Sequence, residues 1–288
     1  RWLSDSDVLL ALGTSLTRTP YGQRVPAGKV LIHNSINPDD INKDEAADIG
    51  LIGDAQLTIQ ALIEMVKAQM GEGCDRAQVE AEVAAVKAEW MAEWTDALTS
   101  DDEPLTYYRV IHEINQNLDL ENSIVTHDAG APRDSIVPFH NATTPHSFIG
   151  WGKSTQLGYS LGLAMGAKLA APEKLCVNVM GDLAFSTVGL DIETAVRCEI
   201  PTLTIVINNA FMSIYDDSRF PVALEKYNIK TLSGEFSEVA QAMGAYTEKI
   251  TGPADIIPAI KRGIAETEAG KAVVLEFITK DEGEYSKF

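Results

Sequence analysis

The sequence predicts an α/β protein with a parallel sheet whose two faces are both covered by helices. Two observations predict this class. From Leu105 onward, short apolar segments of strand length alternate with helical segments, which is the pattern of βαβ units. Three earlier apolar segments, 7–13, 29–34 and 49–52, predict part of a second α/β domain ahead of the first.

The segment 1–70 is expected to hold the later part of that second domain. Its first strand, 7–13, is a continuous apolar run, which is typical of a strand covered on both faces. Such a strand needs neighbours, so we expect further strands upstream in a longer protein. Asp54 is expected to cap a helix that runs to about Met70, with apolar residues at helical spacing.

A helical linker is expected between the two domains. Residues 75–98 are rich in Ala, Glu, Gln and Lys and contain no Gly or Pro, so they predict a solvated helix. Trp90 and Trp94, four residues apart, would anchor one face of it. The polar stretch 99–104 ends in Pro and marks a domain boundary. The predicted domains are therefore 1–70, the linker 71–104, and 105–288.

The elements expected after Leu105 follow one another in regular order. The helices are 105–118, 155–170, 187–198, 234–243 and 253–268, and the strands are 123–126, 175–180, 202–208, 246–249 and 272–278. Gly158, Gly162 and Gly166 lie at helical spacing and predict a close-packing face. Parallel sheets bind ligands beyond the carboxyl ends of their strands, so a site is expected within 127–135, 181–187 and 208–220.

Two of these loops contain residues suited to a metal–diphosphate site. Gly181-Asp182 follows strand 175–180, and Asn208-Asn209 follows the next strand along the chain. A carboxylate, an amide oxygen and a nearby backbone carbonyl are ligands that Mg²⁺ accepts when phosphate oxygens and water complete its shell. Gly181 would let the backbone approach a diphosphate, and the start of helix 187–198 would favour its negative charge. Each pair alone is also consistent with an ordinary turn or cap.

The combination of Gly181-Asp182 and Asn208-Asn209 resembles the magnesium–diphosphate motif of thiamine diphosphate enzymes. The group that it resembles contains acetolactate synthase, benzoylformate decarboxylase, oxalyl-CoA decarboxylase and 2-hydroxyacyl-CoA lyase. The resemblance covers nearly the whole chain. It implies the three-layer thiamine diphosphate-binding fold for 105–288, and the end of a central, Rossmann-like domain for 1–70.

The resemblance also implies roles for individual residues. Asp182 and Asn209 would bind the metal through their side chains, and Phe211 through its carbonyl. Leu157 would be the apolar residue that bends the cofactor, so that its 4′-amino group reaches thiazolium C2; a plain core leucine is the alternative. The residues expected to contact thiamine diphosphate are Asp128, Ala129, Gly130, Leu157, Gly181, Asp182, Leu183, Ala184, Asn209, Phe211 and Met212.

The glutamate that activates the cofactor in this family has no counterpart in the chain. In the family it comes from a separate pyrimidine-binding domain, usually of a second subunit. We therefore expect an upstream domain or chain as partner, a homo-oligomer, and no turnover by this chain alone. Substrate choice is expected in 211–230, a segment with the composition of a mobile lid; a plain surface loop is the alternative.

Charge and cysteine content restrict the remaining possibilities. The net charge of −19 argues against nucleic acid or an anionic membrane as partner, and no run of apolar residues is long enough to span a bilayer. Three scattered cysteines fit a reducing, cytoplasmic location; Cys198 is expected in the core. Three functions stay open: a decarboxylase or carboligase of 2-oxo acids, a lyase of 2-hydroxyacyl-CoA thioesters, and a cofactor-binding subunit without chemistry of its own.

Overall fold

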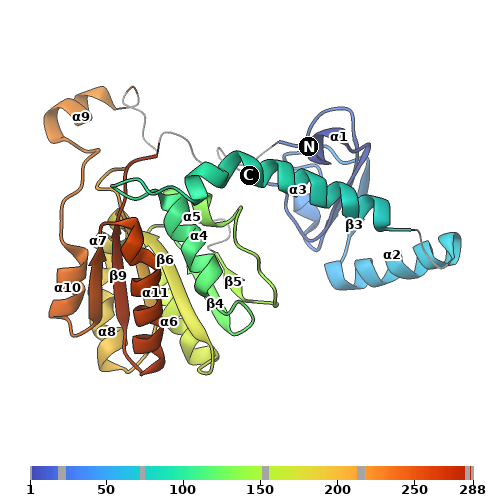
Figure 1. Ribbon diagram of the computed structural model, residues 1–288. Helices are drawn as coiled ribbons and strands as arrows, with labels where there is room; N and C mark the ends of the chain where they lie inside the picture. The colour runs from blue at the N-terminus through green and yellow to red at the C-terminus, as the bar shows by residue number, and fades with distance from the viewer. Residues whose placement is uncertain are drawn as a thin grey trace. The chain divides into compact units, whose positions relative to one another are not determined.

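The chain forms two compact units, 1–85 and 86–288, which divide within one helix (Figure 1). The computed structural model describes residues 2–18, 24–71, 75–150, 156–212, 218, 220–282 and 286. The predicted boundaries at 70 and 104 remain predictions. No helix among the described residues combines the length and apolarity that a bilayer crossing needs.

The first unit is built on a three-stranded parallel sheet in the order β1-β2-β3. Asp54 caps helix α2 as expected, because its carboxylate accepts a hydrogen bond from the Leu57 amide at 3.0 Å. Gly71, with φ +71°, ends that helix. The elements of this unit are α1 (Trp2–Asp5), β1 (Val8–Ala11), β2 (Val30–Ser35), the 3₁₀ turn Pro38–Asp40, β3 (Ile49–Ile52) and α2 (Ala55–Met70).

One face of this sheet is apolar and exposed. Val8 pairs with Val30 across β1 and β2, and Leu10, Ile32 and Ile49 form a row across all three strands. Four side chains on this face, Val8, Leu10, Val30 and Ile49, are each 44–51% exposed. Helix α2 contains no buried residue either. The carboxyl end of the same face is covered, since Asn34 is buried and bonds Thr58 of α2. We call the half-exposed part formed by Val8, Leu10, Val30 and Ile49 the bare face.

The second unit holds a six-stranded parallel sheet in the order β5-β4-β6-β7-β9-β8, which confirms the predicted α/β class. Its four central strands are buried along all or almost all of their length, as strands covered on both faces must be. The strands are β4 (Ser123–His127), β5 (Phe148–Ile149), β6 (Leu175–Gly181), β7 (Leu203–Asn208), β8 (Tyr246–Ile250) and β9 (Val273–Ile278).

Helices cover both faces of this sheet and make three layers. Figure 1 shows α4 (Tyr107–Asn117) and α11 (Pro253–Glu268) side by side on one face, where they share a core with strand residues such as Val177 and Leu275. The other face carries α6 (Tyr159–Ala170), α7 (Asp182–Val188), α8 (Ile192–Arg197) and α10 (Phe236–Ala242) over a second core. Two shorter helices are α5 (Ala131–Ile136) and α9 (Pro221–Tyr227).

The linker helix α3 (Ala77–Leu98) packs with its second half on the second unit. The Trp90 ring stacks on Phe139, and the Trp94 ring lies against Tyr108, each at 4.8 Å between ring centroids. The expected aromatic anchor on an otherwise solvated helix is therefore present.

Three sequence expectations are wrong in detail. The single helix expected at 187–198 is divided. Helix α7 (Asp182–Val188) begins directly after β6 with Gly181 as its N-cap, a 3₁₀ turn (Gly189–Asp191) follows, and α8 covers Ile192–Arg197. Gly162 and Gly166 do not form a close-packing face, since both are exposed and an added Cβ would meet nothing within 4 Å. Cys198 is exposed at the end of α8 rather than buried.

Candidate functional site

Asp182 lies at the carboxyl end of β6, as the first residue of α7, and is only 4% exposed. Its Oδ1 accepts a hydrogen bond from the Leu183 amide at 2.7 Å. Its Oδ2 accepts one from the Ala210 amide at 2.8 Å, which comes from the loop after β7. This carboxylate thus joins the ends of β6 and β7, which their parallel pairing brings to the same edge of the sheet.

Burial raises the pKa of the Asp182 carboxyl from its ordinary value to about 6, against the lowering effect of its backbone hydrogen bonds. None of the described Lys or Arg side chains forms an ion pair with it. A buried carboxylate without a cationic partner is costly in an apolar interior. A bound divalent cation would remove that cost, so this environment fits a metal ligand.

The loop after β7 is a tight turn that carries the other predicted ligands. Asn209 is 6% exposed, and its Oδ1 accepts a hydrogen bond from the Phe211 amide at 3.0 Å, which closes the turn. Ala210 adopts φ +59°, in the left-handed region that non-glycine residues seldom occupy. These contacts hold the Asn209 oxygen close to the backbone segment that is bonded to Asp182.

The carbonyl of Phe211 points away from the segment 230–232, which runs antiparallel beside it. Met212 donates its amide to the Lys230 carbonyl at 2.8 Å, and Leu232 donates to the Ala210 carbonyl at 2.8 Å. Phe211 and Thr231 therefore form a non-hydrogen-bonded antiparallel pair. In such a pair, the central residue's own N–H and C=O face outward, so the Phe211 carbonyl lies on the side of Asn209.

The Asp128 side chain holds the start of helix α6. Asp128 is fully buried, and its carboxylate accepts hydrogen bonds from the Gly158 amide at 3.1 Å and from the Ser160 amide and hydroxyl at 3.2 and 2.6 Å. Leu157, which precedes Gly158, is half-buried and packs against the core under α7. The loop that contains Asp128 and the segment that contains Leu157 are thus tied together, and the Asp128 side chain is fully engaged in holding the start of α6.

The remaining predicted contacts lie around the same edge of the sheet. Gly130 is the N-cap of α5 with φ +77°, and Ala129 beside it is buried. Gly181 has φ −86°, and an added Cβ would lie in ordinary contact with Pro132 at 3.5 Å, so the fold alone does not require glycine there. Leu183 and Ala184 form the first turn of α7. The lid residues 213–217 and 219 lie outside the described residues.

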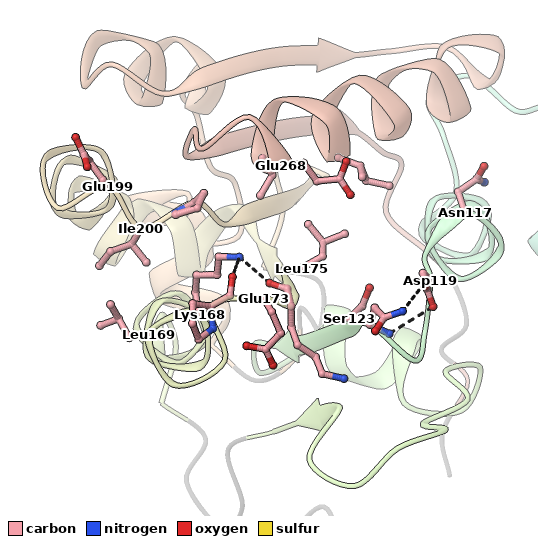
Figure 2. Close-up of a pocket in the computed structure, with 16 residues that line it drawn as sticks. Asn117, Asp119, Ser123, Lys168, Leu169, Glu173, Leu175, Glu199, Ile200 and Glu268 are labelled. Atoms are coloured by element: carbon pink, nitrogen blue, oxygen red, sulfur yellow. Dashed lines mark hydrogen bonds between the residues drawn. The ribbon is translucent and has the colours of Figure 1, made fainter.

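A cavity of about 650 Å³ lies at the opposite, amino ends of the strands (Figure 2). Ser123 and Leu175 begin two of those strands, and Lys168 and Glu268 come from the last turns of α6 and α11. The Lys168 ammonium donates to the backbone carbonyls of Pro172 and Lys174. None of the predicted site residues lines this cavity.

Sequence reasoning did not identify Glu276, which is fully buried in β9 and accepts a hydrogen bond from the Asn208 side chain at 2.7 Å. A signal was present: Glu276 is the single charged residue in the strand Val273–Ile278. Charged residues in such strands are rarely buried unless they are hydrogen-bonded.

The buried parallel sheet and the oxygen atoms gathered at its carboxyl edge define a ligand-binding α/β domain. Comparison with protein families identifies which one. The model of the C-terminal TPP-binding domain of thiamine pyrophosphate enzymes matches residues 128–277, and the model of their central domain matches residues 1–62. The chain belongs to the thiamine pyrophosphate enzyme family.

Several curated proteins resemble the chain over 90% or more of its length. A probable acetolactate synthase large subunit of Methanococcus aeolicus is 23% identical over 91% of the chain and 46% of its own length. Sulfoacetaldehyde acetyltransferase of Rhodobacter capsulatus is 25% identical over 97% of the chain and 51% of its own length. Glyoxylate carboligase of Escherichia coli O157:H7 is 21% identical over 90% of the chain and 46% of its own length. The chain spans about half the length of these relatives.

Proposed function

We propose that the chain supplies the diphosphate- and magnesium-binding half of the active site of an enzyme that makes or breaks carbon–carbon bonds with thiamine diphosphate. The observation that carries this proposal is the buried Asp182 carboxylate at the carboxyl edge of the sheet. It is joined to the loop of Asn209 and Phe211 and has no cationic partner among the described residues.

The donor set fits magnesium. Asp182, the Asn209 amide oxygen and the Phe211 carbonyl are all hard oxygen ligands, and three such ligands leave octahedral positions for phosphate oxygens and water. No group of three or more His, Cys, Asp or Glu in the described part of the chain offers a competing metal site. Gly181 is proposed to let the backbone at the end of β6 approach the diphosphate.

Thiamine diphosphate, when bound, supplies the electron sink for bond cleavage or formation beside a carbonyl. In this proposal, Asp182, Asn209 and Phe211 hold the metal, and the backbones of 128–130, Leu183, Ala184 and Met212 lie along the cofactor. Leu157, directly before the N-cap of α6, would be the apolar residue that supports the cofactor, and Asp128 fixes the backbone there. Placement of the reacting groups is the protein's contribution.

The proposed substrate is a 2-oxo acid, because the relatives include an acetolactate synthase and a glyoxylate carboligase. The alternatives are a lyase of acyl-CoA thioesters and a cofactor-binding subunit without chemistry of its own. Assays with pyruvate and with acyl-CoA thioesters distinguish an enzyme of 2-oxo acids from a lyase of acyl-CoA thioesters. The activating glutamate is proposed to come from an upstream domain, within a homo-oligomer in the cytoplasm, so addition of that domain should produce turnover.

Asp182→Ala tests the metal site directly. The variant removes the one charged side chain of the proposed ligand set, so magnesium-dependent binding of thiamine diphosphate should weaken by more than the roughly 10–100-fold that loss of an outer partner causes. Isothermal titration calorimetry with and without Mg²⁺ measures it. Cys176→Ala is the control, because Cys176 is buried at the far end of the same strand and should retain binding. Wild-type affinity in Asp182→Ala would refute the proposal.

A further inference from the structure

Glu276 occupies a central position in β9, and no solvent reaches it. We propose that Glu276 is a positioning residue for the metal site, which fixes the Asn208 side chain and, through it, the turn that carries Asn209 and Phe211. This inference rests on the proposed metal–diphosphate function and assigns no direct contact with the metal.

Three hydrogen bonds fix the Glu276 carboxylate. Asn208 Nδ2 donates to Oε1 at 2.7 Å, and the amide and hydroxyl of Ser237 donate to Oε2 at 2.8 and 2.7 Å. Each carboxylate oxygen thus has its own donors, which come from β7 and from the start of α10. Because buried polar groups that are fully paired adopt one orientation, Asn208 is held in a single position.

The position of Asn208 sets the turn beyond it. Its Oδ1 accepts a hydrogen bond from the Ala210 amide at 3.0 Å, and the same amide donates to Asp182 Oδ2 at 2.8 Å. The turn also needs this support, because Ala210 has a left-handed φ of +59°. A continuous hydrogen-bonded path therefore runs from Glu276 through Asn208 and Ala210 to Asp182.

The chemistry of the pair suggests a sharp test. In Glu276→Gln, the new side-chain oxygen must accept the hydrogen bonds from Ser237. Its NH₂ group then faces the NH₂ group of Asn208, two donors meet, and the hydrogen bond between positions 276 and 208 is lost. Asn208→Asp added to that variant restores a donor–acceptor pair with its direction reversed and with the same total charge. Ser237→Ala is the matched control, because Glu276 Oε2 keeps the Ser237 amide and the bond to Asn208 is untouched.

The experiment measures the dissociation constant of the full chain for Mn²⁺ or Mg²⁺ at saturating thiamine diphosphate. It also measures the thermal unfolding midpoint of the chain without metal and without cofactor. Glu276→Gln should bind the metal about 10–100-fold more weakly, as variants of outer metal-site partners do. The double variant should return toward the wild-type constant, and Ser237→Ala should keep it even where its thermal midpoint falls. A purely structural role would lower the midpoint and leave the dissociation constant unchanged.

The outcomes separate this inference from the function on which it rests. Absence of metal-dependent binding in the wild type would overturn the proposed function. Wild-type binding together with unchanged affinity in Glu276→Gln would overturn the positioning role alone. If Glu276→Gln does not fold, Asn208→Ser breaks the link to Glu276 while leaving an oxygen for the Ala210 amide; the same weakening is expected, and unchanged affinity would refute the role.

Discussion

At the scale of single residues, buried polar groups explain the shape of the candidate site. Asp128 and Asp182 are both buried acids at strand ends, yet they have different surroundings. Asp128 accepts from Gly158 and Ser160 on both oxygens, whereas Asp182 accepts two amides and has a pKa raised by burial. The first is a structural anchor for α6, and the second retains the unmet charge that a metal would satisfy.

Gly158 is a residue whose substitution the fold should not tolerate. It has φ +86°, and an added Cβ would lie 2.5 Å from Val188. Gly158→Ala should therefore destabilise the protein by about 2–4 kcal/mol, from the left-handed backbone and the clash together. Gly162→Ala, in open space on the same helix, should stabilise by about 0.5–1 kcal/mol. Urea unfolding measures both, and similar effects from the two would contradict the structure.

His140 should make the second unit sensitive to acid. Burial, together with the neighbouring His127, lowers the pKa of its imidazole from 6.5 to about 4. Because the folded pKa is below the unfolded one, the stabilising contribution is present above pH 6.5 and is lost as the pH falls toward 4. Urea midpoints from pH 7 to 4 should fall less in His140→Gln than in the wild type. Equal slopes would exclude this origin.

At the scale of elements, the sequence predicts the strands and helices correctly where the apolar pattern is strong. Every strand expected after Leu105 is present, and helix α2 has Asp54 as its expected N-cap and ends at Met70 as expected, because these features follow from local chemistry and burial. The expected helix 187–198 differs from α7 and α8 because a helix can begin directly at a residue such as Asp182 that also suits a ligand, and spacing does not reveal the 3₁₀ turn between the two helices. The exposed Gly162 and Gly166 could not be predicted, since helical spacing does not say which face is covered.

The aromatic anchor of α3 should contribute measurably to stability. Trp94 is partly buried against Tyr108 and Phe139, so Trp94→Ala should cost about 2–3 kcal/mol, below the range for fully buried aromatic residues. Val83→Ala on the exposed part of the helix should change stability by no more than about 0.5 kcal/mol. Chemical denaturation followed by circular dichroism tests the pair, and equal effects would show that the tryptophan does not anchor the helix.

At the scale of the whole molecule, the family could be identified from sequence because two short motifs lie at the ends of consecutive strands. The α/β class and the family are confirmed. The roles of Asp182, Asn209 and Phe211 remain predictions, since a ligand set depends on how the groups surround the metal and not on their spacing in the chain. The part played by Glu276 depends on register between β7 and β9, which sequence spacing does not reveal.

The bare face of the first sheet has a practical consequence in solution. The chain carries a net charge of −19, so at low ionic strength its copies repel one another. Salt shortens the range of that repulsion from about 10 Å at 0.1 M to about 3 Å at 1 M. The apolar side chains Val8, Leu10, Val30 and Ile49 can still associate with other copies, because salt does not weaken contacts between apolar groups. Light scattering should therefore rise with salt, and Leu10→Lys should suppress the rise. A purified sample should therefore stay dispersed best in buffer of low ionic strength. Light scattering that changed neither with salt nor with Leu10→Lys would show that the side chains of the bare face are covered in solution.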